Sequence, residues 1–549
     1  MSMFSKRLAS LLLIGLVISL GLSIGAMVQF TDTTDAGGFS VIPIQPDVVG
    51  VLHAQGRAFQ YPFPNSVNVG KKFNPQGSAI GSLSIAPEQR VLVIFVEFTT
   101  PPPGGPDTRL DLQYFDDMLF GTVYDPPEYA TYPTHPTDRT LHNYYNEVSY
   151  GQVDIVTLNL PSEMGWMQSG HAYDYYCKAD GVHDYGMGLY PNNAQGLVVD
   201  AITAADPYVD FSKYAVNGGV PNLFIVHAGT GAEWSLMLSN GIAGPDPSII
   251  WSHDWDLTQG TGMNGYLVDG VKINHYAMMP EIGGDMTGYS GIVSGPYPPT
   301  VGVYAHEYGH VLGLPDQYDY GYESTGTGIF SLMASGVWNR YPDLPIFSGN
   351  TPSHLDAWSK CRLGFVIPTV VDSYASVSLP PVETNPVVYK MIVPNSDGKE
   401  YFLLENRQQI GFDQGLLRPS YWNAHGLAIY HVDDTVLSRN YWFPNEAENW
   451  KEFRSEGWRK AWTGETHYAI SIVQADDRWD LEFARNVGDS GDLYPGQLGV
   501  HNLSSFTLPN TSAYYFWAGS QPKFGYSGVT ITDIQETDNT VTAILSFVH

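Results

Sequence analysis

Two histidines and a glutamate between residues 306 and 310 have the residue types and the spacing of a catalytic metal site. The segment reads His306-Glu307-Tyr-Gly-His310. On a helix, His306 and His310 lie one turn apart on the same face, so both imidazoles can reach one ion at the roughly 2.0–2.1 Å typical of zinc. Glu307 then lies beside the ion, where it can act as the general base for a water molecule.

The residues around this segment predict how a third ligand reaches the ion. Thr300 follows two prolines and is predicted to cap the start of the helix, while Gly313 can end it in a left-handed turn. The proline that follows cannot continue the helix, so the chain reverses and brings Asp316 back as the third metal ligand. Asp319, Glu323 or a more distant carboxylate is the alternative. Three protein ligands leave the fourth position to water, as a catalytic zinc site requires.

The wider sequence resembles the immune inhibitor A family of secreted metallopeptidases, which are metzincin-like. The motif extends to Gly313 and Asp316 and is followed by Ser331-Leu-Met333-Ala-Ser-Gly336, which resembles a Met-turn. The resemblance implies that Met333 supports the metal ligands without coordinating the ion, and that the cofactor is Zn²⁺. It covers roughly residues 88 to 548, and the other segments that carry it are 141–153, 250–253, 357–364, 405–407 and 488–496.

The N-terminal part of the chain is predicted to contain an export or anchor segment followed by a linker or pro-segment, ahead of the folded enzyme. Lys6 and Arg7 come before an uncharged, mostly apolar stretch, so residues 1–30 are interpreted as a signal peptide or membrane anchor, with attachment through residues 8–30. Residues 31–88 are rich in Gly, Pro, Asn and Gln and are interpreted as a linker or short pro-segment. They contain no cysteine, so an inhibitory ligand from this segment would be a group such as Asp47 or His53.

The folded part is predicted to have a mixed α/β (α+β) metzincin-like catalytic domain over residues 89–368. Strands alternate with helices, which is typical of an α/β unit. The apolar runs predict strands buried on both faces, and helical spacing of apolar residues predicts the helices. Asp138 is the predicted N-cap of the second helix. The predicted strands are 90–98 and 221–227, and the predicted helices are 107–120, 138–148 and 197–205.

Residues 369–549 are predicted to form an all-β, sandwich-like C-terminal domain. Their apolar residues alternate along short strands and no long helical pattern is evident. The last two strands flank a polar stretch and predict a hairpin. The predicted strands are 401–405, 426–432, 467–474, 529–534 and 541–548.

The charge balance favours cations over nucleic acids as partners. The chain has 56 Asp and Glu against 26 Lys and Arg, a formal net charge of −30, and a negative field repels phosphates. One acid-rich patch contains Asp476, Asp489 and Asp492 and is a candidate calcium site, because calcium takes six to eight oxygen ligands. A solvated acidic loop is the alternative interpretation.

The remaining reactive residues give no second site. Cys177 and Cys361 are the two cysteines, which excludes a disulfide framework and a thiolate-rich zinc finger but leaves one disulfide open. Three further histidines lie in apolar surroundings and are interpreted as packed residues without a role: His227, His253 and His275.

The sequence as a whole predicts a zinc-dependent endopeptidase that hydrolyses proteins or peptides outside the cell, secreted or anchored at the outer face of the membrane. The alternative from another class is a surface structural or adhesive protein that retains the peptidase fold and binds through its C-terminal β domain. A third hypothesis is a pro-form held at the membrane and released by cleavage.

Overall fold

The computed structural model describes residues 40–44, 85–102, 109–124, 136–234, 245–283, 298–321, 323–343, 348–418, 422–446, 467–515 and 525–548. The predicted signal or anchor (1–30) and the groups Asp47 and His53 lie outside the described residues. Among the residues described, no helix combines the length and the apolar character needed to span a membrane.

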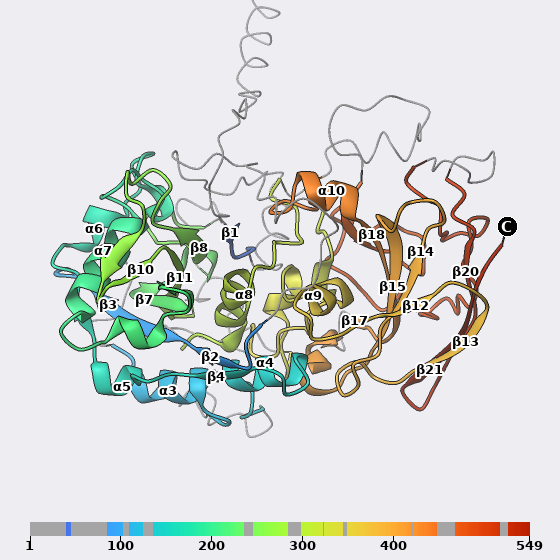
Figure 1. Ribbon diagram of the computed structural model, residues 1–549, viewed down its shortest axis with the longest axis horizontal. Helices are drawn as coiled ribbons and strands as arrows, with labels where there is room; N and C mark the ends of the chain where they lie inside the picture. The colour runs from blue at the N-terminus through green and yellow to red at the C-terminus, as the bar shows by residue number, and fades with distance from the viewer. Residues whose placement is uncertain are drawn as a thin grey trace, which may run out of the picture.

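A six-stranded mixed sheet forms the centre of the N-terminal part (Figure 1). Its order is β1-β8-β11-β7-β3-β5. Strands β5, β3, β7 and β11 run parallel, whereas β8 and β1 are antiparallel to their neighbours. The strands are β1 Ser40–Val41, β8 His253–Asp256, β11 His275–Ile282, β7 Leu223–Thr230, β3 Leu92–Glu97 and β5 Met167–Gln168. All of β7 and five of the six residues of β3 are buried, which confirms the two strands predicted to be covered on both faces.

Helices cover this sheet, and α8 lies between it and α9 (Figure 1). The principal helices are α3 Leu112–Phe120, α4 Leu141–Val148, α7 Ala194–Ala205, α8 Val301–Val311 and α9 Ala357–Arg362, with the short helices α5 Pro161–Met164, α6 Tyr173–Tyr176 and α10 Asp434–Arg439. Asn193 caps α7, whose predicted position is confirmed. The predicted cap Asp138 of α4 is wrong: Thr140 has the extended backbone of a cap and accepts a hydrogen bond from the Asn143 amide.

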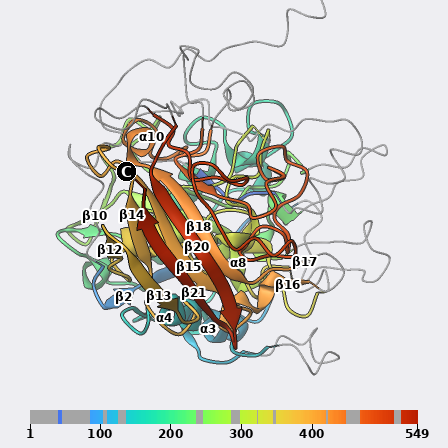
Figure 2. The same cartoon turned by 90° about the vertical axis from the view of Figure 1, so that its right-hand side faces the viewer.

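The C-terminal part is rich in β structure, as predicted. One sheet has the order β12-β14-β15-β18-β19 and a second has the order β13-β21-β20 (Figure 2). The predicted final hairpin is confirmed as the antiparallel pair β20–β21, and the strand predicted over 467–474 is shorter. The strands are β12 Thr369–Val371, β13 Ala375–Leu379, β14 Tyr389–Ile392, β15 Glu400–Arg407, β18 Gly426–Asp433, β19 Ile470–Ile472, β20 Val529–Thr537 and β21 Thr540–Phe547. Minor strands are β2 Glu88–Arg90, β4 Asp154–Val156, β6 Gly219–Val220, β9 Tyr266–Val268, β10 Val271–Ile273, β16 Leu417–Arg418 and β17 Trp422–Asn423.

Strand β15 joins two hydrophobic cores. Tyr401 and Leu403 belong to the large core that also contains the central sheet, whereas Phe402 and Leu404 belong to a smaller core shared with β20 and β21. Successive side chains of a strand point to opposite faces, so this alternation separates two apolar environments rather than core and solvent. The β-rich part therefore packs directly against the part that carries the histidine motif.

A buried ion network crosses this contact. The Arg407 guanidinium donates to both carboxylate oxygens of Asp413 at 2.7 Å and also to the carbonyl of Phe330 at 2.7 Å. Glu405 accepts from Lys360 Nζ at 2.9 Å. Burial alone would lower the pKa of Arg407, but the negative charges of Asp413 and Glu405 hold it above its usual range. Phe330 lies next to the predicted Met-turn, so the network links β15 to that turn.

The sequence segment predicted to be a linker or pro-segment contributes to the central sheet. Residues 40–44 are all buried. The Ile42 amide donates to Ser252 O at 3.2 Å, and the indole of Trp338 donates to Pro43 O at 2.8 Å. Cys177 and Cys361 are both free, so the structure contains no disulfide between them.

Replacing Arg407 with methionine should strongly destabilise the fold. The substitution leaves the buried carboxylate of Asp413 without its cation, which typically costs about 3–5 kcal/mol, whereas Glu405 keeps its pair with Lys360. Urea unfolding measures the loss. The control is Arg90→Ala, which breaks a half-exposed pair with Glu88 and should change stability by about 1 kcal/mol or less. Equal losses in the two variants would contradict the structural role of Arg407.

Candidate metal centre

Helix α8 carries the histidine motif through the interior of the protein. Residues 301–310 are all buried, so the helix packs on every side rather than presenting a polar face to water. Thr300 occupies the N-cap position, but its side chain makes no capping hydrogen bond and donates instead to Ser348 O at 2.6 Å. Thr300 therefore occupies the predicted cap position, but the predicted hydrogen bond from the helix to its hydroxyl is absent.

The end of α8 sets the position of the third predicted ligand. Gly313 has φ 95°, the left-handed conformation predicted for it. Its amide donates to His310 O at 2.8 Å and the Leu314 amide donates to Gly309 O at 3.0 Å, which together form a Schellman motif. The chain then reverses and carries Asp316 back to the histidines.

Three ligand atoms converge on one point. His306 Nε2 and His310 Nε2 lie 3.0 Å apart. Asp316 Oδ1 lies 3.1 Å from His306 Nε2 and 3.3 Å from His310 Nε2. Ligands placed tetrahedrally about 2.0 Å from an ion are roughly 3.3 Å from one another. The triangle of atoms therefore has the dimensions of three corners of a tetrahedral metal site.

The hydrogen bonds behind the imidazoles direct their lone pairs into this triangle. His306 Nδ1 lies 2.9 Å from Leu332 O and His310 Nδ1 lies 2.8 Å from Leu314 O. A carbonyl can only accept, so each Nδ1 carries a proton and each neutral Nε2 presents a lone pair. Asp316 Oδ1 is buried without a hydrogen bond. Two lone pairs and an unsatisfied carboxylate oxygen facing one another fit a bound cation.

The charge states of these groups fit the same interpretation. Burial lowers the pKa of His306, which favours the neutral, ligating form. Burial alone would raise the pKa of Asp316, but the two imidazoles hold it at about 2, so this carboxylate is ionised at neutral pH. Burial alone would lower the pKa of His310 as well, but the negative charge of Asp316 raises it above its usual value. An ion bound between the two imidazoles would take the place of a proton on His310 Nε2 and leave two nitrogens and one negative oxygen, the donor set of a hydrolytic zinc site.

Glu307 is a buried carboxylate with neither oxygen hydrogen-bonded. Burial raises its pKa well above the usual range, and the charges of Asp254 and Asp316 raise it further. A general base that works near neutral pH needs such a raised pKa. The charge of the predicted ligand Asp316 acts on Glu307, so this carboxylate lies in the neighbourhood of the ligand triangle.

The predicted Met-turn lies beneath this centre. A Cβ atom on Gly309 would lie 2.5 Å from Met333 Sδ, so only glycine leaves room for the thioether between the two histidine turns. Gln317 N donates to Met333 O at 2.7 Å. Asp356 Oδ2 accepts from both Gln317 Nε2 and Ser331 Oγ, at 2.7 and 2.8 Å, and so ties the loop after the histidines to the turn.

The alternatives for the third ligand lie elsewhere. Asp319 Oδ1 accepts from the Gly321 amide at 2.8 Å, and neither Asp319 nor Glu323 is grouped with the histidines among the described residues. Two further residues near the centre escaped the sequence analysis: Tyr320, whose hydroxyl donates to Asp316 Oδ2, and Asp254 of β8. No motif spacing points to them: Tyr320 lies four residues after Asp316 in the same loop, and Asp254 reaches the centre through the pairing of β8 in the sheet.

The acid-rich patch is only partly assembled. Carboxylate oxygens of Asp476, Asp480 and Asp489 lie within 4.8 Å of one another, so Asp480 takes the place predicted for Asp492. The buried Asp492 accepts from the Asp489 amide at 2.6 Å instead. Such a cluster is also typical of a solvated acidic loop.

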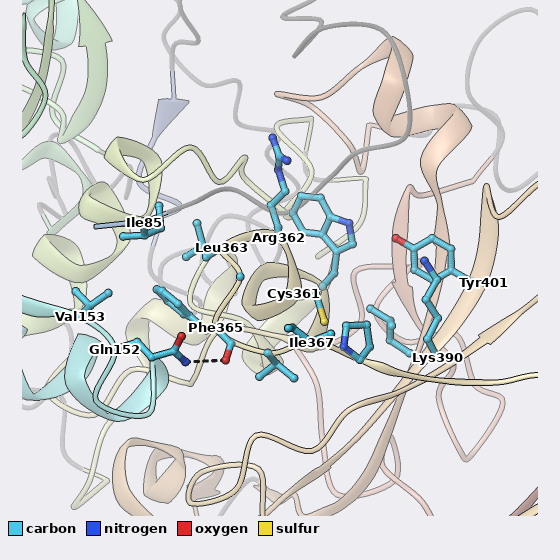
Figure 3. Close-up of a pocket in the computed structure, with 15 residues that line it drawn as sticks. Ile85, Gln152, Val153, Cys361, Arg362, Leu363, Phe365, Ile367, Lys390 and Tyr401 are labelled. Carbon is cyan, nitrogen blue, oxygen red and sulfur yellow. Dashed lines mark hydrogen bonds between the residues drawn. The ribbon is translucent and has the colours of Figure 1, made fainter. Parts of the chain in front are cut away.

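The other histidines and a cavity beside α9 do not add to the centre. His227 and His253 are fully buried in the sheet, and burial lowers the pKa of each to about 4. A cavity of about 540 Å³ lies between α9 and β14–β15 (Figure 3). The Arg362 side chain points away from Lys390 in it, and none of the metal-centre residues lines it.

Known proteins similar to this chain share the motif-bearing part. The sequence profile described as "Immune inhibitor A peptidase M6, catalytic domain" matches residues 88–364. Immune inhibitor A of Bacillus thuringiensis subsp. alesti is 31% identical over 300 residues, which are 50% of this chain and 39% of that protein. Pre-pro-metalloprotease PrtV of Vibrio cholerae serotype O1 (strain M66-2) is 27% identical over 320 residues, 53% of this chain and 32% of that protein. The match thus spans less than two-fifths of each relative.

Replacing Asp316 with alanine should remove most of the zinc affinity. A direct ligand should cost more than the roughly 10–100-fold that residues orienting a ligand cost. Competition with a chromogenic chelator measures the affinity. The matched control is Asp319→Ala, three residues along the same loop, which should bind zinc like the unmodified chain. If the two variants exchange these behaviours, Asp319 is the ligand.

Proposed function

Since this chain belongs to the immune inhibitor A peptidase M6 family, we propose that it is an extracellular zinc-dependent endopeptidase acting on proteins or peptides. The observation that carries the proposal is the triangle of His306 Nε2, His310 Nε2 and Asp316 Oδ1, 3.0 to 3.3 Å on each side. His306, His310 and Asp316 would hold the ion, with Met333 as support. The names of both relatives and the intact motif favour an enzyme over an adhesive protein.

The proposed reaction divides the work between the ion and one side chain. A zinc ion held by the three residues would supply a Lewis acid for the scissile carbonyl and lower the pKa of a water to about 7. Glu307 takes the proton of the attacking water and passes it to the nitrogen of the departing amine. The buried position of Glu307 keeps its carboxylate poorly solvated, and therefore basic enough for the first of these transfers.

The division of the chain into domains is part of the same proposal. Residues 89–368 would form the metzincin-like catalytic domain, and 369–549 a β-sandwich built from the two sheets that enclose the smaller core. Residues 1–30 would export the chain or anchor it outside the cell. Calcium at Asp476, Asp489 and Asp492 stays a prediction from the sequence, which a calorimetric titration with calcium can test.

Residues 31–88 would be a pro-segment, of which the described residues 40–44 cover the active site. The support comes from residues 40–44, which run beside the centre. The Tyr318 hydroxyl donates to Val41 O, and the rings of Tyr318 and Tyr320 lie 4.8 Å apart. Tyr320 in turn donates to Asp316. One relative is a pre-pro-metalloprotease by its name, and a segment bound there would keep substrate away until it is cleaved.

Replacing Glu307 with glutamine should abolish hydrolysis while zinc stays bound. The amide keeps the shape of the side chain but cannot take a proton, and general-base catalysis contributes typically about 10²–10⁴-fold. Casein digestion measures activity and metal analysis measures zinc. Glu323→Gln is the matched control and should keep both. Undiminished digestion by the Glu307 variant would refute the mechanism.

Weakening β1 should raise the activity of the unprocessed chain. Ile42→Pro removes the amide that donates to Ser252 O, so the segment should leave the edge of β8 more often. The rate of digestion before any N-terminal cleavage is the measurement. Ile42→Val keeps the amide and should behave like the unmodified chain. If Ile42→Pro is no more active, residues 40–44 do not block the site.

A further inference from the structure

Strand β8 lies near the outer edge of the central sheet and is covered there by the two residues of β1. Apart from the two residues of β1, no described strand pairs with its outer side. Its edge therefore offers a row of backbone donors and acceptors to any extended peptide. Residues 40–44 now occupy this place, with Val41 held by Tyr318 next to the metal ligands.

Asp254 projects from β8 toward the catalytic helix. It pairs across the sheet with Ala277, which pairs with Phe224, so the three side chains share one face. The ring of Phe224 packs edge-on against Tyr308 of α8 at 5.7 Å, which identifies this face as the one covered by α8. Asp254 therefore lies on the same side of the sheet as Glu307.

The buried Asp254 carboxylate has one counter-charge among the described residues, at Oδ1, and its Oδ2 has no hydrogen bond. Its side chain is 1% exposed, and neither oxygen has a hydrogen bond. Among the described residues one ion-pair contact is found, with His275 Nε2 at 3.0 Å from Oδ1. Burial alone would lower the pKa of His275, but this contact with Asp254 raises it, so the pair satisfies one of the two carboxylate oxygens. A buried carboxylate left in this state costs free energy that a cation of the right reach would recover.

A cationic side chain could reach Asp254 from the position that Ser40 occupies. It is the direct partner of Asp254 in the β1–β8 register, and directly opposed side chains have Cβ atoms about 4.5–5.5 Å apart. The Ser40 hydroxyl is buried and also without a hydrogen bond. The short serine side chain thus leaves its own hydroxyl and Asp254 Oδ2 unsatisfied, whereas a longer basic side chain at this position would reach the carboxylate.

We propose that the position opposite Asp254 along β8 is a substrate subsite for a lysine or arginine side chain, and that Asp254 is the residue that selects it. The inference rests on the proposed peptidase function and names its substrate class: extended peptides with a basic residue at this position. The residue opposite Asp254 lies on the same face whether the peptide runs parallel or antiparallel to β8. The net charge of −30 also attracts basic peptides to the protein.

The first test uses the full chain and its own segment. Ser40→Lys places a basic side chain opposite Asp254, and Ser40→Met is the control of similar length without charge. Hydrogen exchange of the Ile42 amide reports how often the segment leaves β8. Ser40→Lys should slow this exchange roughly three- to tenfold relative to Ser40→Met, and Asp254→Asn should abolish the difference. Equal exchange in the Lys and Met variants would overturn the subsite.

The second test uses added peptides and the full chain with Ile42→Pro, which opens the edge. Peptides that differ at one position in Lys, Met or Glu are compared by kcat/KM. One position should prefer Lys over Met at least about tenfold, the size of one favourable charge contact. Asp254→Asn should reduce this ratio to near one, and Asp254→Glu should keep a preference for Lys. The ratio is compared within each variant, because the charge of Asp254 also acts on Glu307.

A binding measurement separates this inference from the proposed function. The same peptides are titrated, by fluorescence anisotropy, into the chain with Ile42→Pro and Glu307→Gln. Tighter binding of the Lys peptide that Asp254→Asn removes supports the subsite even if no variant hydrolyses anything. Hydrolysis without a preference for Lys, or a preference that survives Asp254→Asn, overturns the subsite and leaves the peptidase standing.

Discussion

The structure depends on one constraint: two imidazole nitrogens and a carboxylate oxygen lie close together in a fully buried site. Each Nε2 presents a lone pair because each Nδ1 donates to a backbone carbonyl. Like-oriented lone pairs 3.0 Å apart repel each other, and burial prevents water from screening them. A cation turns this repulsion into coordination, so folding around the centre and metal binding are coupled.

The surroundings of the centre keep these groups in place from several directions. The Schellman turn after α8 supplies both the reversal that brings Asp316 back and the Leu314 carbonyl that holds His310. The Tyr145 hydroxyl of α4 donates to Ala305 O at 2.6 Å. Arg407 reaches from the C-terminal sheet to Phe330 O beside the Met-turn. The β-rich part is therefore a structural component of the catalytic centre, in line with the core it shares through β15.

The sequence predicts those features that depend on local pattern. The strands over β3 and β7, helix α7 and the left-handed Gly313 follow from apolar runs, helical spacing and the need for positive φ. The cap of α4 was predicted wrongly, and Thr300 occupies the predicted cap position of α8 without making the capping hydrogen bond. Several hydroxyl and carboxyl groups compete for each helix end, and tertiary contacts decide between them. Asp254 escaped prediction because strand pairing with distant elements brings it to the centre, and Tyr320 because nothing in the sequence fixes the conformation of the loop after Asp316. Nothing in the sequence near Ser40 indicates that it pairs with a strand more than two hundred residues away.

The open edge of β8 explains why a pro-segment and a substrate would use the same place. An uncovered edge strand next to buried apolar surface invites pairing with other chains, so such edges are usually blocked. A peptidase that binds extended peptides cannot block the edge permanently with a bulge or a proline. A short strand from its own N-terminal region covers the edge instead. Only a few hydrogen bonds hold it, at Val41, Ile42 and Pro43, so the strand can leave and expose the edge again. The poor fit of Ser40 to Asp254 has the same consequence, because a cover that satisfied the carboxylate fully would compete too strongly with substrate.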